Sequence, residues 1–250
     1  MTYTPFEFRV FPIFVYYIFL SIFAIFMSIK MYKKWKERKV PPPLYLTIVF
    51  IFFSAALTVL GIGLAEAVIT EEYREIYRFS LPFAYSMVIF ADIFLFRFAT
   101  HMTNKGRDAF PLVIIIGVIL AIVLYLPWNW WGVPAEDYEG MLNIRLYSTS
   151  GLVLFSLIIY SYIALICQKT KTKVDDKVTF TGLKLLFYSI ICLILLFVML
   201  IGDTLLITLF DHPGYSEFTY IAWIFGSLFI VLSYFSLVMP KWLIKRIEEN

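Results

Sequence analysis

Seven long apolar segments, separated by short polar connections, constrain the fold of this chain more than any single residue does. Hydrophobic residues make up 61% of its 250 residues and charged residues only 16%, whereas an average soluble domain has about 25% charged residues. A soluble fold of this size cannot bury that much apolar surface, so the bilayer must solvate most of it. The sequence therefore predicts an all-α membrane protein with a single transmembrane domain over residues 1–250.

The length of the apolar segments predicts helices. A spanning helix needs about 20 apolar residues, and lipid offers no partner for backbone polar groups, which a helix satisfies internally. The segments do not alternate polar with apolar residues as barrel strands do. We expect a bundle of seven transmembrane helices at about 8–30, 44–69, 79–101, 110–127, 147–168, 183–210 and 218–240. The basic cluster follows the first segment, so we expect that segment to be retained and not cleaved as a signal peptide.

Positive charge is concentrated in alternate connections between these segments. Short loops rich in Lys and Arg stay in the cytoplasm, which predicts an outer N-terminus, an inner C-terminus and a location in the plasma membrane. The basic inner surface should attract anionic lipid. Sixteen of the 21 basic residues fall after the first, third and fifth segments or in the C-terminal tail: Lys30, Lys33, Lys34, Lys36, Arg38, Lys39, Lys105, Arg107, Lys169, Lys171, Lys173, Lys177, Lys184, Lys241, Lys245 and Arg246.

Prolines are expected only near the ends of the spans. Pro41–Pro43 precede the second predicted helix, and Pro82 falls in the first turn of the third. A proline inside a helix removes a hydrogen bond and kinks the helix. We therefore expect continuous helices without proline hinges.

Four of the ionisable residues in the spans are functional candidates, because burial of a charge in a membrane is costly and often functional. Asp92 and Arg97 in the third segment are predicted switch residues, although Asp92 is also explained as a structural polar bridge between helices. Asp203 and Glu66, near the outer ends of their segments, are predicted ligand-binding residues. For Asp203 a purely structural role is an equal alternative.

A loop rich in tryptophan, glycine and proline follows the fourth segment. We expect Trp130 and Trp131 to form, together with Trp223, the wall of an outer ligand-binding cavity that this loop covers. The alternative is an aromatic belt at the membrane interface.

Several classes of function are disfavoured by the residues present. His101 and His212 fall at opposite ends of the membrane, so they cannot share a metal ion, and no histidine lies where it could act as the base of a catalytic triad. We therefore expect no catalytic residues, no metal site, no cofactor and no enzymatic activity. Nucleic-acid binding has no motif in the chain. Gly61, Gly63, Ala65 and Ala67 form two overlapping small-x-x-x-small pairs, which predict close helix packing, either within the bundle or in a homodimer.

Three short motifs resemble prokaryotic seven-transmembrane sensor regions, the N-terminal membrane modules of histidine kinases. They are Leu126-Pro127-x-Asn129 with Gly132, the stretch Asn143–Ser148, and the ending Leu237-Val238-Met239-Pro240-Lys241-Trp242-Leu243. The resemblance implies a seven-helix sensor whose last helix leads to a cytoplasmic output. We expect no output domain after Asn250, so the chain would either signal through a separate cytoplasmic partner at the basic inner loops or be a detached input module.

The sequence thus predicts a receptor-like or sensor membrane protein that detects a small ligand or membrane signal from the outer face. Two alternatives stay open. One is a small-solute transporter of the seven-helix type, built from two parallel three-helix repeats. The other is a structural subunit of a membrane complex.

Overall fold

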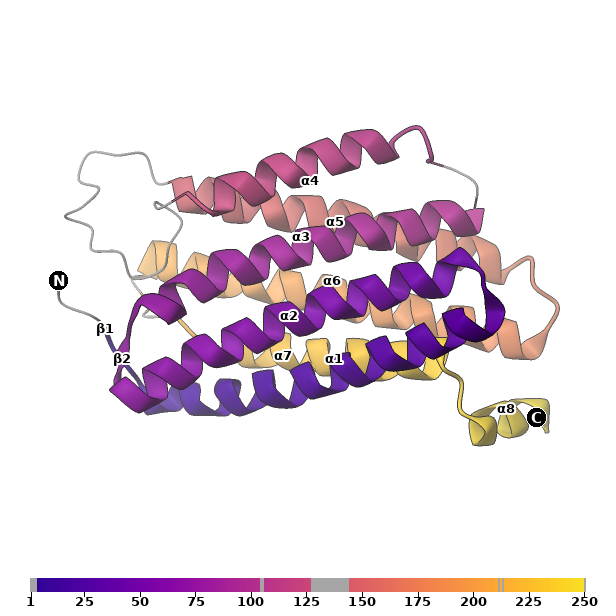
Figure 1. The fold of residues 1–250 in the computed structure, drawn as a ribbon, viewed down its shortest axis with the longest axis horizontal. Helices are drawn as coiled ribbons and strands as arrows, with labels where there is room; N and C mark the ends of the chain where they lie inside the picture. Colours follow the sequence, from indigo (N-terminus) through magenta and orange to yellow (C-terminus); the bar gives the residue numbers. More distant parts are fainter. Residues whose placement is uncertain (1–3, 104–105, 127–143, 211, 213, 250) are drawn as a thin grey trace. The chain divides into compact units, whose positions relative to one another are not determined.

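The fold is built from apolar helices in sequence order (Figure 1). The computed structural model describes residues 4–103, 106–126, 144–210, 212 and 214–249. The helices are α1 (Phe11–Arg38), α2 (Pro41–Thr70), α3 (Glu75–Thr103), α4 (Phe110–Leu124), α5 (Ile144–Lys171), α6 (Lys177–Phe210), α7 (Glu217–Leu237) and α8 (Lys241–Glu248). The 3-10 turn η1 (Phe8–Val10) leads into α1, and the strands β1 (Thr4–Pro5) and β2 (Glu72–Tyr73) form one antiparallel pair.

Six of these helices, α1, α2, α3, α5, α6 and α7, are long and apolar enough to cross a membrane. Many of their large apolar side chains remain exposed, as lipid-facing side chains do. The chain is therefore an all-α, multi-pass membrane protein, as the sequence predicts.

Helix α4, which corresponds to the fourth predicted span, is shorter than predicted. It ends at Leu124, not near residue 127, and its 15 residues span about 22 Å, against about 30 Å for the hydrocarbon core. Only Gly117, Ala121 and Leu124 are buried in it. A Cβ on Gly117 would lie 2.7 Å from Cδ1 of Ile93, so α4 packs closely on α3 along this one stripe.

Other helix ends differ from the predicted ranges. α1 continues through the basic cluster to Arg38, and α6 begins at Lys177, so many of the predicted loop lysines lie on helix termini. Long basic side chains tolerate this position because they extend to the interface. α3 begins at Glu75, which places Pro82 inside the helix. The prediction that prolines lie only near helix ends is wrong there.

The chain forms two compact units, residues 1–29 with 41–156 and residues 30–40 with 157–250. In the first unit, α2 packs along α3 at Gly63, where an added Cβ would lie 2.6 Å from Oγ and 2.9 Å from Cβ of Ser80. The expected role of the small residues in bundle packing is thus confirmed for Gly63. The hydroxyls of Ser21 and Thr58 join α1 to α2 at 2.6 Å.

In the second unit, α6 packs along α7. Gly202 lies against the ring of Phe218, and Gly226 lies against Leu196. The predicted helix over residues 218–240 ends at Leu237, and Met239 takes a left-handed conformation with φ of 46°. Pro240 is the N-cap of the amphipathic helix α8, a helix that was not among the predicted segments.

Candidate functional site

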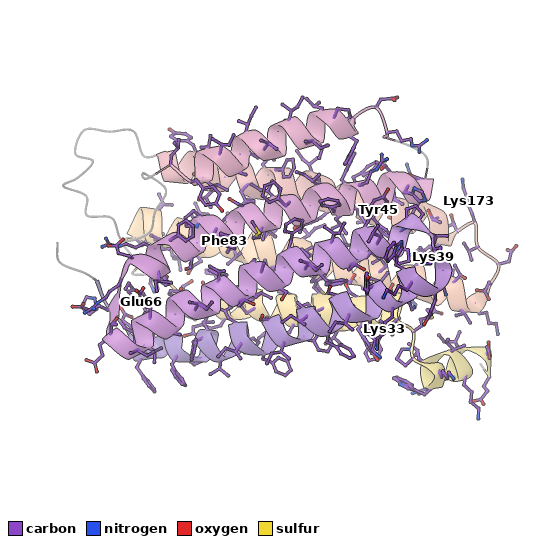
Figure 2. The ribbon with its side chains drawn as sticks, viewed as in Figure 1. Lys33, Lys39, Tyr45, Glu66, Phe83 and Lys173 are labelled. Atoms are coloured by element: carbon purple, nitrogen blue, oxygen red, sulfur yellow. The ribbon has the colours of Figure 1, made fainter. Side chains whose placement is uncertain are left out.

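Glu66, a predicted ligand residue, lies near the C-terminal end of α2 and binds the start of α3. Its Oε2 accepts a hydrogen bond of 3.0 Å from the backbone N–H of Tyr77, the third residue of α3. The first four N–H groups of a helix have no partner within the helix, and a carboxylate there also favours the positive helix end. Figure 2 shows Glu66 at the end of α2 opposite to Tyr45.

Asp203 makes the corresponding contact in the second unit. Its Oδ1 accepts hydrogen bonds from the backbone N–H of Ser216 at 2.8 Å and from the Ser216 hydroxyl at 2.6 Å. Ser216 is the N-cap of α7, yet its side chain does not cap its own helix. Asp203 instead ties the start of α7 to the last turns of α6, which gives the carboxylate a structural role beside any role in binding.

A buried hydroxyl lies one turn from this contact. Thr219 is 4% exposed, and among the described residues its Oγ1 has no hydrogen-bond partner. A threonine inside a helix usually donates to the carbonyl four residues earlier, but that residue here, Tyr215, lies before α7. The sequence analysis missed Thr219 because its burial depends on how α7 packs.

Trp223 lies seven residues further along α7 than Ser216, about 10 Å by helical rise. Its ring lies beside Gly226, one turn further along the same helix, and Gly226 itself lies against Leu196 of α6. Trp130 and Trp131 lie outside the described residues. Glu66 belongs to the first unit and Trp223 to the second, so their common cavity stays a prediction.

The two predicted switch residues face different partners. Asp92 is fully buried, and its Oδ2 accepts a 2.6 Å hydrogen bond from the hydroxyl of Ser156, which is also fully buried. This contact joins α3 to α5. The guanidinium of Arg97 lies 4.8 Å from the centre of the Phe110 ring, at the start of α4. Five residues along a helix correspond to a rotation of about 140°, so Asp92 and Arg97 cannot share one face.

Three hydrogen bonds within the second unit hold the C-terminal end of α7 in place. The Ser236 hydroxyl donates to the carbonyl of Gly182 at 2.8 Å, which joins α7 to α6. The ammonium group of Lys34 donates to the carbonyls of Leu237 and Val238, the latter at 3.1 Å. A cation at a helix C-terminus satisfies free carbonyls and complements the helix dipole.

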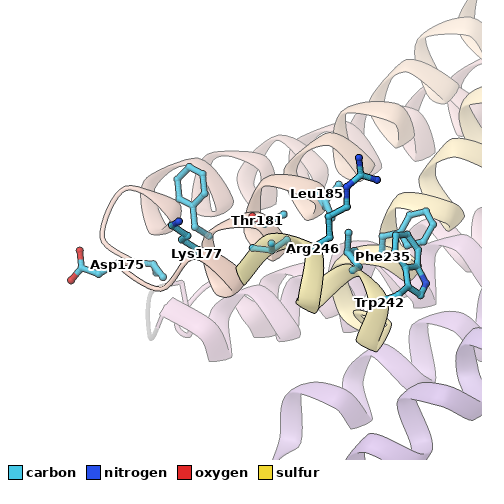
Figure 3. Close-up of a pocket in the computed structure, with 11 residues that line it drawn as sticks. Asp175, Lys177, Thr181, Leu185, Phe235, Trp242 and Arg246 are labelled. Atoms are coloured by element: carbon cyan, nitrogen blue, oxygen red, sulfur yellow. The ribbon is translucent and has the colours of Figure 1, made fainter. Parts of the chain in front are cut away.

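An open pocket of about 720 Å³ lies beside this fastened end, and we call it the foot pocket (Figure 3). It lies between the start of α6, the end of α7, and α8. Its polar lining comes from Asp175, Lys177, Thr181 and Arg246. The other lining residues are Val174, Phe180, Leu185, Phe235, Trp242, Leu243 and Ile247.

The start of α6 at the foot pocket is held by its own cap. Asp176 accepts hydrogen bonds from the hydroxyl and the backbone N–H of Thr179, at 2.5 and 2.8 Å. These bonds favour the ionised carboxylate and hold the pKa of Asp176 below its ordinary value. An Asp at this position is a common N-cap, so the sequence carried the signal although the predicted helix began six residues later.

The hydrogen bonds of these residues join one helix to another. Among the residues that the structure describes, no group of three or more His, Cys, Asp or Glu side chains could hold a metal ion. His101 stacks edge-on against Tyr45, and Nδ1 of His212 accepts a hydrogen bond from the N–H of Gly214.

The fold and the sites define an all-α, multi-pass membrane protein with a helix pair, α6 and α7, that is hydrogen-bonded at both ends. Comparison of the chain with protein-family models, with curated proteins and with solved structures finds no match.

Proposed function

We propose that this chain is a seven-helix sensor of the plasma membrane, with its N-terminus outside and its C-terminus in the cytoplasm. It detects a small ligand or a membrane signal at the outer end of α6 and α7. It then signals through the inner end of α7 to a separate cytoplasmic partner, without enzymatic activity of its own.

The observation that carries this proposal is that hydrogen bonds join α7 to α6 at both ends of α7. Ser216 binds Asp203 at one end, and Ser236 binds the carbonyl of Gly182 at the other. The two serines are 20 residues apart, about 30 Å along the helix. A shift of α7 along α6 must break or rearrange both contacts, and packed helices move between discrete arrangements more readily than they deform continuously.

The outer end supplies groups that could receive a signal. Asp203 is a carboxylate inside a spanning helix, and the Thr219 hydroxyl is buried without a hydrogen-bond partner among the described residues. A ligand that hydrogen-bonds to Thr219 or competes with Ser216 for Asp203 would favour a different position of α7.

The inner end of α7 offers a surface that could pass the signal to a partner. Lys34 holds the last carbonyls of α7, and α8 follows directly after the left-handed residue Met239. A non-glycine residue with positive φ is strained by about 1–2 kcal/mol. A shift of α7 could relieve this strain at Met239, between α7 and α8. The exposed bases of α8, among them Lys241 and Lys245, form the surface to which an acidic partner would bind.

Hydrogen exchange of the full chain in lipid nanodiscs tests the proposal. We expect Asp203→Asn to speed backbone exchange in residues 235–247, at the opposite end of α7. Asp108→Asn, which changes an exposed carboxylate before α4, is the matched control. Faster exchange confined to residues 214–220 would contradict signalling along α7.

Solute transport is the second candidate, and one observation favours it. In the pair α2 and α3 a carboxylate near the end of the first helix binds the start of the second, through Glu66 and Tyr77. The pair α6 and α7 repeats this arrangement with Asp203 and Ser216. These are the second and third helices of the first and last groups of three, as two parallel repeats would require. Solute flux above background in liposomes that contain only this protein would replace the sensor with a transporter.

A further inference from the structure

We propose that the foot pocket binds one anionic phospholipid from the membrane leaflet that contacts the basic face of the protein. The lipid phosphate binds Arg246, Lys177 adds positive charge to the same pocket, and the upper part of an acyl chain lies along the apolar lining. This site is independent of the proposed function, because a sensor, a transporter and a structural subunit could each hold such a lipid.

The lining of the pocket combines two kinds of surface that a phospholipid needs. Lys177 and Arg246 bring positive charge from two different helices, α6 and α8. Phe180, Leu185 and Phe235 supply apolar walls from α6 and α7. A guanidinium and an ammonium group bind phosphate oxygens through charge-assisted hydrogen bonds, while apolar walls contribute in proportion to the acyl surface that they cover.

The pocket also contains one carboxylate, that of Asp175. Figure 3 shows this carboxylate directed away from Arg246, at the far side of the pocket. A phosphate at Arg246 therefore avoids direct repulsion by Asp175, whereas Lys177 lies on the Asp175 side and acts through its charge. The charge of the polar lining is positive on balance, with Lys177 and Arg246 against Asp175.

Helix α8 has the pattern of a helix that lies in the membrane interface. At about 100° per residue, Leu243, Ile244 and Ile247 fall within one sector of the helix, and Lys241 and Lys245 fall outside it. Such a helix places its apolar face at the acyl boundary and its basic face among headgroups. Trp242, which is 58% exposed, has the residue type and position of an interfacial anchor.

The position of the pocket identifies the ligand as a lipid. It is bounded by the first turns of α6 and the last turns of α7, both of which are long enough to span a membrane, and by α8. This is the level at which headgroups meet acyl chains. Its volume of about 720 Å³ is within the range of sites that hold drug-sized ligands, about 300–1,000 Å³. A headgroup with the first carbons of an acyl chain is of that size, and only a ligand with both parts uses both surfaces.

Native mass spectrometry of the full chain tests the proposal. The protein is reconstituted in phosphatidylcholine nanodiscs with increasing phosphatidylglycerol, and the phosphatidylglycerol that it retains after release is counted. We expect one retained molecule at low phosphatidylglycerol content. Lys177→Gln and Arg246→Gln should each weaken its retention about fivefold, the effect of one basic charge at a membrane surface.

Two further variants distinguish a defined site from diffuse attraction. Lys245→Gln removes the same charge from the exposed face of α8, outside the pocket, and should change retention little. Thr181→Phe fills the pocket without changing any charge and should abolish retention of the single lipid. Equal losses in Lys245→Gln and Arg246→Gln, or full retention in Thr181→Phe, would overturn the proposal. Displacement by millimolar inorganic phosphate would do so as well, because the ligand would then be a soluble anion.

Discussion

Ser216 donates two hydrogen bonds to the same oxygen of Asp203, one from its backbone N–H and one from its hydroxyl. The N-cap residue of α7 is thereby held by a carboxylate of α6 and not by its own helix. Any displacement of α7 along α6 must break both bonds at once. In the sensor that we propose, this contact is the point at which a signal would act on the helix pair.

Loss of the Asp203 carboxylate should destabilise the protein. We expect Asp203→Ala to lower the free energy of unfolding by roughly 1–3 kcal/mol, because it leaves two donors of Ser216 without their charged acceptor. Asp203→Asn keeps a carbonyl oxygen and should cost less. Denaturant titration in mixed micelles measures both values, with Asp108→Ala as the exposed control. An equal, negligible effect of all three variants would show that the contact contributes nothing to stability.

The six long helices follow from the sequence because a spanning segment is specified locally, by about 20 consecutive apolar residues. The end of α1 and the start of α6 could not be derived from the sequence, because a lysine in the terminal turn of a helix and a lysine in a loop look alike in sequence. α8 carried a readable signal in its alternation of Lys241 and Lys245 with apolar residues. That segment entered the prediction through its charges and through the motif that ends at Leu243, without a helix being predicted there.

The residues of the candidate sites were partly predictable. Asp92, Asp203 and Glu66 stand out as carboxylates in apolar segments, and each makes a specific contact in the structure. Their partners could not be derived. Ser216 reaches Asp203 only because the preceding turn has positive φ at Gly214 (91°) and Tyr215 (50°), and Ser156 reaches Asp92 only because α5 packs on α3 there.

The contact of Asp92 with Ser156 gives a test of whether Asp92 is structural or functional. Ser156→Ala removes a donor from a fully buried carboxylate, and we expect a loss of roughly 1–3 kcal/mol in unfolding free energy. Ser189→Ala, which removes a buried hydroxyl bonded within its own helix, is the control and should cost less. If Ser156→Ala matches that control, the inter-helix contact is not a source of stability.

Two neighbouring glycines of α2 should respond in opposite ways to substitution by alanine. A Cβ on Gly63 would lie 2.6–3.0 Å from atoms of Ser80 and Tyr77 in α3, so Gly63→Ala should cost roughly 1–3 kcal/mol. Gly61 has its nearest atom, Cβ of Tyr17, at 3.8 Å, so Gly61→Ala should be neutral or stabilise the helix by up to about 1 kcal/mol. Thermal unfolding compares the two. Equal tolerance would mean that α2 and α3 are not packed as closely as described.

The cap of α6 should depend on pH through Asp176. The hydrogen bonds from Thr179 lower the pKa of Asp176 in the folded protein. The cap is therefore fully formed above the ordinary aspartate pKa and is lost as the pH falls through the lower, folded-state pKa. After correction for intrinsic rates, amide exchange at residues 177–180 should rise in acid. In Asp176→Ala it should be fast throughout and should not respond to acid, and a wild-type response in that variant would exclude Asp176 as the cause.

A double-mutant cycle between the two ends of α7 tests the coupling of these ends most directly. Ser216→Ala removes the hydroxyl hydrogen bond to Asp203 and leaves the backbone one, and Ser236→Ala removes the hydrogen bond to the carbonyl of Gly182. The unfolding free energies of both single variants and of the double variant are measured in mixed micelles. Sites about 30 Å apart normally combine additively to within about 0.5 kcal/mol. If α7 shifts as a unit, the two effects should depart from additivity by more than that, while Ser216→Ala with Ser189→Ala stays additive. Additivity in both pairs would contradict the coupling of the two ends of α7.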